Sequence, residues 1–144
     1  MDLFHKHSYF NNGVTSMIKI NNLKDLDTFI EMIPDMVFFK NVNYEYIYFN
    51  NTYLNFIQKS REEVINKTVF DLYSIENASK FNRDDQNILH GDQDQSFEEI
   101  FIKDNDENLF FYTTKQIVYD ENRNKLGLFC IVKDITTERQ YQTI

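Results

Sequence analysis

Three long apolar segments in the C-terminal part of the chain restrict most strongly what it can fold into. They span residues 97–103, 109–119 and 125–133, and they are rich in the β-branched and aromatic residues typical of strands. The links between them, 104–108 and 120–124, are short, polar and rich in turn-forming residues. Successive strands joined by short links pair antiparallel, so the sequence predicts a three-stranded meander.

The N-terminal part adds a helix, a hairpin and several short helices. Residues 23–33 carry apolar side chains at helical spacing, and Pro34, the only proline, ends that segment. Segments 36–40 and 46–49 are typical of two hairpin strands. Helices are then expected at 50–58, after Ser60 with Glu63 completing a capping box, from Thr68 or Val69, and from about 75 to 91.

This order of elements predicts an α+β domain. We expect a five-stranded antiparallel sheet with short helices on one face, an N-terminal flanking helix and a C-terminal exit helix. The helix at 23–33 either covers the outer face of the sheet or pairs with its copy in a homodimer. The expected division is a flanking segment at 1–22, a domain at 23–135 and the start of the exit helix at 136–144.

The last strand continues directly into a polar, helix-prone tail. Asp134 or Thr136 can cap the new helix, and Glu138 falls in its first turn, where an acidic residue suits the helix dipole. A strand that continues into a helix leaving the domain is typical of a mechanical output. The residues assigned to signal output are Asp134, Ile135, Thr136, Glu138 and Arg139.

Composition excludes several classes of function. The net charge of −8 and the absence of a basic run argue against nucleic acid or an anionic membrane surface as partner. No apolar stretch approaches the ~20 residues of a membrane span. Because Cys130 is the only cysteine and no signal peptide is visible, we expect a cytoplasmic protein.

Five segments, in this order, resemble the PAS sensor family over roughly residues 23–140. The resemblance covers most of the chain, and Asn66 stands where the family often has glycine, a swap that left-handed geometry tolerates. The segments are Ile33-Pro34-Asp35-Met36-Val37-Phe38-Phe39-Lys40, Tyr48-Phe49-Asn50-Asn51-Thr52-Tyr53, Ser60-Arg61-Glu62-Glu63-Val64-Ile65-Asn66-Lys67, Val69-Phe70-Asp71-Leu72 and Asp134-Ile135-Thr136-Thr137-Glu138-Arg139.

The resemblance implies a pocket between the concave face of the sheet and the short helices. Alternate strand residues face one way, and pattern alone leaves two registers open. One register puts Phe101, Phe111 and Thr113 inside. We expect the other, in which Tyr112 and Thr114 orient a small ligand, or else aromatic side chains simply fill the cavity. The residues predicted for the pocket are Ile100, Ile102, Phe110, Tyr112, Thr114 and His90.

The same resemblance allows flavin and haem to be weighed as cofactors. Val69 stands where blue-light members carry the flavin-attacking cysteine, and Cys130 lies in an apolar strand, where an inert thiol is expected. A flavin adduct is therefore not predicted. His90 falls at the end of the long helix, where a histidine more often complements the helix dipole than binds haem iron. No cofactor and no metal is assigned.

The resemblance implies a sensory or signalling module without catalysis of its own. No phosphate loop, nucleophile elbow or zinc-protease motif occurs in the sequence, and acidic pairs such as Asp84-Asp85 are typical of solvated surface. The module would bind a small ligand or a partner, form a homodimer and control a downstream histidine kinase or a cyclic-dinucleotide enzyme such as a diguanylate cyclase. The alternatives are a ligand-free dimerisation scaffold and a haem-based gas sensor acting through His90.

Overall fold

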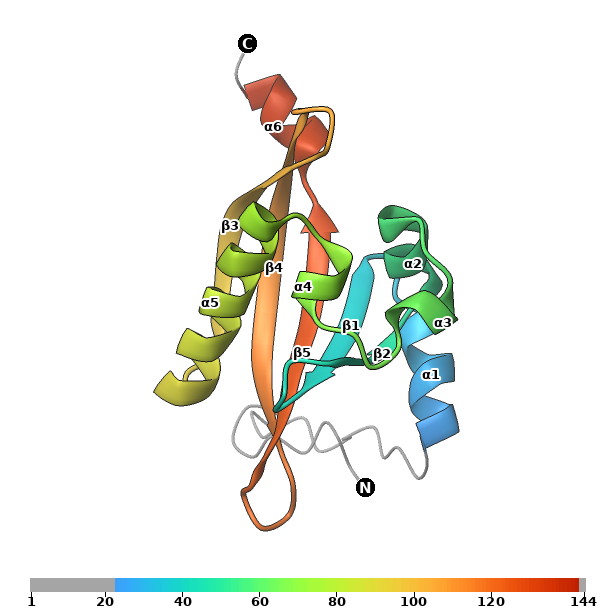
Figure 1. The fold of residues 1–144 in the computed structure, drawn as a ribbon, viewed down its shortest axis with the longest axis vertical. Coiled ribbons are helices and arrows are strands. Elements are labelled where there is room, and N and C mark those ends of the chain that lie inside the picture. The colour runs from blue at the N-terminus through green and yellow to red at the C-terminus, as the bar shows by residue number, and fades with distance from the viewer. Residues whose placement is uncertain (1–22, 143–144) are drawn as a thin grey trace.

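A computed structural model describes residues 23–142. Five strands form one antiparallel sheet in the order β2-β1-β5-β4-β3, and helices pack around it (Figure 1), which confirms the predicted α+β class. The elements are α1 (Leu23–Glu31), β1 (Met36–Asn41), β2 (Tyr46–Phe49), α2 (Asn51–Ile57), α3 (Arg61–Val64), α4 (Val69–Leu72), α5 (Ile75–Gly91), β3 (Gln95–Ile102), β4 (Asn108–Tyr119), β5 (Lys125–Asp134) and α6 (Thr136–Gln142). The predicted flanking segment 1–22 lies outside the described residues.

Short polar signals in the sequence set the ends of the short helices. The hydroxyl of Ser60 accepts from the amide of Glu63, and the Glu63 carboxylate accepts from the amide of Ser60, which is the predicted capping box at the start of α3. Asn66 has a φ of 63°, the left-handed conformation that its short polar side chain tolerates. The capping box and the left-handed turn at Asn66 hold α3 in place although it has only one turn.

Asn50 joins three parts of the domain in its interior. Its side-chain oxygen accepts from the backbone amides of Val37, in β1, and Tyr53, in α2, at 3.1 and 3.0 Å. Its amide nitrogen donates to three backbone carbonyls between the end of α1 and the start of β1. Through these bonds to buried and partly buried backbone groups, Asn50 fixes the start of β1 against both helices.

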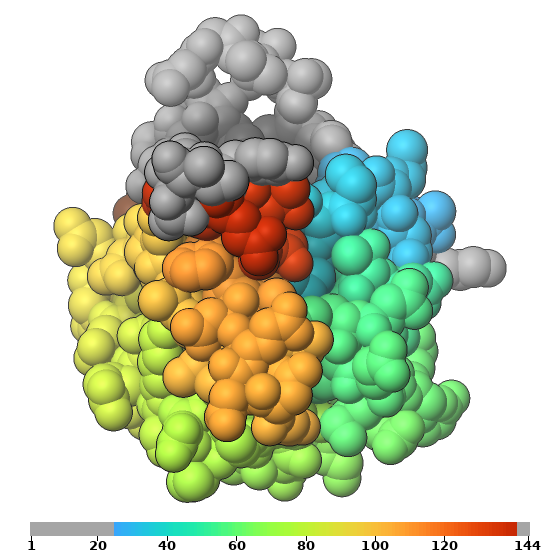
Figure 2. Space-filling view, turned by 90° about the horizontal axis from the view of Figure 1, so that it is seen from above, coloured from blue at the N-terminus to red at the C-terminus, as the bar shows by residue number. Residues whose placement is uncertain are grey.

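The two faces of the sheet are covered by different elements. Helices α2 to α5 pack against the inner face and enclose the larger apolar core. Helix α1 lies next to β2 on the outer side, and its buried Leu26 and Ile30 form a smaller core with residues of β1 and β5. Figure 2 shows, from above, the orange residues of β4 between α5 with β3 on one side and the segment from β1 to α3 on the other. The first helix therefore has the predicted intramolecular role, and its pairing with a second copy stays a prediction.

Candidate functional site

A cavity lies between the inner face of the sheet and the helices. Its volume is about 40 Å³, whereas one water molecule needs roughly 10–15 Å³ of probe-occupied space. The lining side chains come from strands β1 to β5 and from α2 and α5, with one more from the segment between α4 and α5. They are Met36, Phe38, Lys40, Tyr46, Tyr53, Phe56, Tyr73, Phe81, Glu99, Phe101, Phe111, Thr113, Lys115 and Val132.

The predicted register of β3 and β4 is wrong. Ile100, Ile102 and Tyr112 lie on the outer face with exposed fractions of 45%, 45% and 43%. Phe110 and Thr114 share that face: Phe110 borders an outer hollow, and Thr114 shares a hydrogen bond with the hydroxyl of Ser96. The register held as the alternative is the one observed, with Phe101, Phe111 and Thr113 buried against the helices.

The polar character of the true inner face explains the error. Along with its aromatic residues it carries Glu99, Thr113 and Lys115, so the outward set with Ile100 and Ile102 looks the more suitable for a core. Buried polar groups are tolerated where they pair with one another, and pairing partners from α5 and β1 were not visible from strand alternation. Which face of β3 and β4 is buried is therefore decided by the hydrogen bonds and ion pairs of Glu99, Thr113 and Lys115, and not by how apolar each residue is.

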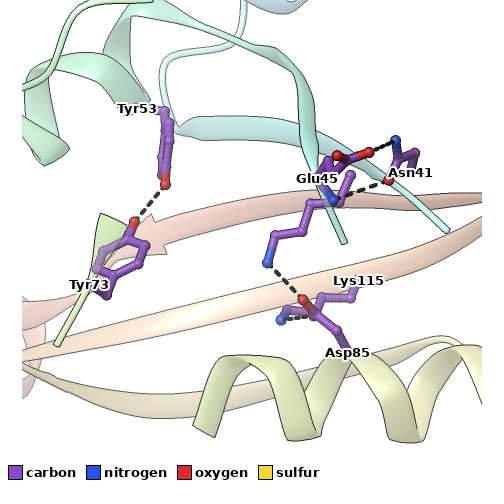
Figure 3. A network of polar contacts seen from close by, with 7 residues as sticks. Asn41, Glu45, Tyr53, Tyr73, Asp85 and Lys115 are labelled. Atoms are coloured by element: carbon purple, nitrogen blue, oxygen red, sulfur yellow. Dashed lines mark hydrogen bonds and ion pairs between the residues drawn. The ribbon is translucent and has the colours of Figure 1, made fainter. Parts of the chain in front are cut away.

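A buried ion triad ties α5 to two strands. The carboxylate of Asp85 accepts from the ammonium groups of Lys40, in β1, at 2.7 Å and Lys115, in β4, at 2.5 Å (Figure 3). Burial alone would raise the pKa of Asp85, but the charges of Lys40 and Lys115 outweigh it and hold that pKa below its usual value. The same attraction overcomes burial at Lys40 and raises its pKa, so both groups are charged.

Sequence reasoning missed this triad because it took Asp84-Asp85 as a solvated pair. The side chain of Asp85 is fully buried, whereas that of Asp84 is half-buried. The missed signal is a spacing within α5: Asp85 lies three residues before Ile88 and four before Leu89, which places it on the apolar, inward stripe of the helix. A charged residue on such a stripe indicates a buried partner of opposite charge.

Three tyrosines line another part of the cavity wall. The hydroxyls of Tyr53 and Tyr73 lie 2.6 Å apart (Figure 3), and the ring of Tyr46 stacks on Tyr53 with centroids 5.4 Å apart. Burial raises the pKa of all three hydroxyls, which keeps them neutral and able to donate. This wall therefore offers neutral hydrogen-bonding groups beside aromatic faces.

Glu99 is the second carboxylate at the cavity. The hydroxyl of Thr113 donates to its Oε2 at 2.5 Å. Its Oε1 is buried and has no hydrogen-bond partner within residues 23–142. The ammonium of Lys80 lies 3.8 Å from Oε1, too far for a hydrogen bond, and donates instead to the backbone carbonyl of Ile100.

The residues considered for flavin or haem binding are Cys130, Val69 and His90. Burial raises the pKa of Cys130 to about 12, so its thiol stays protonated and is a poor nucleophile. Val69 is a buried apolar residue at the start of α4. His90 is exposed in the last turn of α5 and does not line the cavity, so the prediction that it belongs to the pocket is wrong.

The exit helix is attached to the first residues of β4. The amide of Ile135 donates to the carbonyl of Phe110 at 2.8 Å, and the amide of Phe110 donates to the hydroxyl of Thr136 at 3.0 Å. The carboxylate of Asp134 accepts from the amide of Thr136 at 2.9 Å, which forms a tight turn just before α6. Figure 1 shows α6 at the end of the sheet that carries the β3–β4 turn.

One ion pair continues this attachment to β3. The guanidinium of Arg139 pairs with the carboxylate of Glu98. Glu138 lies in the first turn of α6, as expected, and is exposed. The predicted output residues are therefore brought together at one end of the sheet, around Phe110 and Glu98.

Neighbouring residues on the same strands face the cavity and the exit helix. On β3, Glu98 contacts α6 while Glu99 points into the cavity. On β4, Phe110 holds the start of α6 while Phe111 lines the cavity. The side chains of Glu98 and Glu99 point to opposite faces of the sheet, as alternate strand residues do, whereas Phe110 reaches α6 through its backbone amide and carbonyl. Adjacent positions on β3 and β4 therefore contact the exit helix and the cavity.

This sheet, with helices on its inner face around a small cavity and a helix leaving from its last strand, defines a sensory domain of the PAS type. The family model described as PAS fold matches residues 30–140, and the chain belongs to the PAS family. PAS is a regulatory sensory fold. Within residues 23–142, no helix has the length and apolar character to cross a bilayer.

Proteins with similar sequence or structure include ArcB, BvgS and VqmA. The aerobic respiration control sensor protein ArcB of Escherichia coli is 26% identical over 117 residues, which cover 81% of this chain but 15% of ArcB. The PAS domain of Bordetella pertussis BvgS superposes with a TM-score of 0.69 at 13% identity, covering 84% of this chain and 93% of that domain. Vibrio cholerae VqmA, in a complex with ligand and DNA, superposes with a TM-score of 0.67 at 20% identity, covering 82% of this chain and 53% of VqmA. The two structural likenesses show the fold alone.

Proposed function

We propose that this PAS domain binds a small molecule in the enclosed cavity and transmits the resulting change to α6. The observation that carries the proposal is the pair of adjacent positions, Glu98 with Glu99 and Phe110 with Phe111, which face α6 and the cavity from the same strands. VqmA, whose structure holds a ligand, supports a ligand-binding role for the fold. The ligand site proposed here replaces the outward-facing set with the cavity lining.

The mechanism requires two arrangements that a ligand distinguishes. A ligand shifts an equilibrium only by the difference between its affinities for the two states. A molecule seated among Glu99, Phe101 and Phe111 changes how these side chains pack against α5, and a small displacement of β3 and β4 reaches Phe110 directly. The Asp85 triad holds α5 to β1 and to Lys115 of β4, so we expect the displacement to be confined to the part of β3 and β4 near Phe110.

A downstream effector would then respond to the orientation of α6. The match to a small part of ArcB, a sensor protein, supports a sensor histidine kinase as that effector, and a cyclic-dinucleotide enzyme is the second choice. We propose that the domain acts in the cytoplasm, where a single buried and unreactive thiol is suited to reducing conditions.

Native mass spectrometry of the purified protein tests the proposal, with denaturing extraction and a visible spectrum of the same sample. The account predicts a stoichiometric small-molecule mass, lost in the variant Thr113→Leu, which enlarges a side chain that lines the cavity. The matched control is Thr114→Leu, a substitution one residue away on the outer face. An apo protein that takes up no small molecule from a metabolite extract would overturn the proposal.

A second candidate function is a dimerisation scaffold. The exposed Ile100, Ile102 and Tyr112 favour it, because no described element covers them within residues 23–142, and an apolar patch of this kind marks an interaction surface. Sedimentation of Ile100→Asp separates the two functions. A scaffold would lose its dimer in this variant, whereas ligand uptake by the cavity would remain.

A further inference from the structure

Glu99 places a hydrogen-bond acceptor without a donor at the cavity. Its Oε2 is engaged by the hydroxyl of Thr113, whereas its buried Oε1 has no hydrogen-bond partner within residues 23–142. A buried carboxylate oxygen without a donor costs free energy, and a donor placed there recovers a charge-assisted hydrogen bond. Glu99 lines the same cavity, so the missing donor fits a molecule bound inside.

The rest of the cavity sets the shape and size of that molecule. The rings of Phe56, Tyr73, Phe81, Phe101 and Phe111 form a connected series, with neighbouring centroids 5.3–6.1 Å apart. Such walls favour a flat apolar body. A volume of about 40 Å³ leaves room for only a few non-hydrogen atoms.

The charges around the cavity select against an ion. Asp85 pairs with both Lys40 and Lys115, and Glu99 forms a longer ion pair with Lys80, so each charged group at the cavity already faces an opposite charge. A cation would add a further positive charge beside Lys40 and Lys115, and an anion would meet the carboxylate of Glu99. Because charge interactions are strong away from water, either ion is penalised more than a neutral molecule.

We infer that the cavity selects a small, flat, uncharged molecule that donates one hydrogen bond to Oε1 of Glu99. This inference rests on the proposed function and names the ligand class of that site. The ammonium groups of Lys40 and Lys115, each with donors beyond the one given to Asp85, supply a partner for an acceptor on the same molecule. A heteroaromatic ring with one N–H and one acceptor nitrogen has the required chemistry.

Pyrazole and isoxazole are a matched pair of probes for this inference. Both are flat, neutral five-membered rings with an acceptor nitrogen, but only pyrazole carries an N–H donor. Backbone amide shifts of the labelled protein would be followed by NMR while each probe is titrated. Loss of a hydrogen bond to a charged group predicts binding at least about tenfold weaker for isoxazole. Acetamidinium and acetate, the planar cation and anion, should bind more weakly than pyrazole.

The variant Glu99→Gln tests the named residue. Thr113 donates to Oε2, so the amide oxygen of glutamine is retained there and its NH₂ group takes the place of Oε1. The cavity then presents a donor, and the preference for pyrazole over isoxazole should fall to about onefold or less. Glu121→Gln, an exposed substitution in the β4–β5 turn, should leave the ratio unchanged.

Each outcome separates the inference from the proposed function. Equal binding of pyrazole and isoxazole, or binding of either ion more tightly than pyrazole, overturns the inference that the ligand is neutral and donates a hydrogen bond to Glu99. The proposed function, a cavity that accepts small molecules, would remain. Failure of every probe to shift the cavity amides overturns the inference, and the mass-spectrometric test then decides the proposed function independently. If Glu99→Gln fails to fold, the ratio of pyrazole to isoxazole affinity in the unaltered protein still tests the inference.

Discussion

The cavity and the exit-helix junction lie on the same strands but are held by opposite kinds of interaction. At the cavity, Lys40, Asp85 and Lys115 form ion pairs that are buried on all sides. At the junction, Arg139 and Glu98 pair at the surface, with side-chain exposures of 34% and 51%. Buried pairs cost several kcal/mol to break, whereas exposed pairs contribute about 0–1 kcal/mol.

The difference between buried and exposed ion pairs fits the proposed roles of the cavity as input and of the exit-helix junction as output. Under the proposed function the interior keeps its geometry in order to recognise a ligand, and the triad holds α5 to β1 and β4. The junction must be reversible, and a few surface hydrogen bonds around Phe110 and Thr136 are weak enough to re-form in another arrangement. The predictions below test whether the two regions differ in this way.

Breaking the triad should have the largest effect. In Asp85→Asn, two buried ammonium groups lose their counter-charge, and the free energy of unfolding should fall by about 3–5 kcal/mol. Urea denaturation measures this. Asp84→Asn, one residue away on the same helix and half-buried, should change stability by less than about 1 kcal/mol. Equal losses in the two variants would mean that the triad does not anchor α5.

Acid should remove the contribution of the triad. The pKa of Asp85 is lowered in the folded protein, so its stabilisation is fully present above the unfolded carboxyl pKa of about 3.9 and is lost as pH falls through the lower folded value. The stability difference between the unaltered protein and Asp85→Asn should therefore be constant from neutral pH to about pH 5 and shrink in stronger acid. A difference that grows on acidification would contradict the pairing.

Loosening the junction should act locally. Thr136→Val removes the acceptor for the amide of Phe110, and α6 should become less stable by about 1 kcal/mol, with several-fold faster amide exchange. Global unfolding should shift by no more than about 0.5 kcal/mol, because the cavity region is untouched. Thr137→Val, an exposed position in the same helix, is the control. A large global loss would show that the junction belongs to the core.

The surface ion pair should contribute least. Glu98→Gln should cost about 0.2–1 kcal/mol at low salt. Raising the ionic strength to about 1 M should abolish the difference from the unaltered protein, since exposed pairs are screened. Urea denaturation at the two salt concentrations provides the measurement, and an effect that salt does not change would indicate a buried interaction.

The sequence predicted the elements better than the cavity. Polar caps and turn formers such as Ser60 and Asn66 mark element ends locally, so the order of helices and strands follows from short-range chemistry. The passage from the last strand through Asp134 into α6 was also predicted from local residues, and the structure has a helix there.

The strand register and the buried charges could not be predicted from the same signals. Both faces of β3 and β4 carry apolar residues, and the inner face carries Glu99 and Lys115 as well, so alternation favours the wrong side. The choice depends on Asp85, which reaches Lys115 from 30 residues away in the chain. Only the tertiary arrangement brings these charges together.

Amide hydrogen exchange of α6, with the cavity empty and with pyrazole bound, tests the central claim most directly. If the adjacent positions on β3 and β4 couple the two regions, exchange at residues 136–142 should change at the same pyrazole concentration as the cavity amides of Glu99 and Phe111. Cavity amides that respond while the exchange of α6 stays constant would contradict the account.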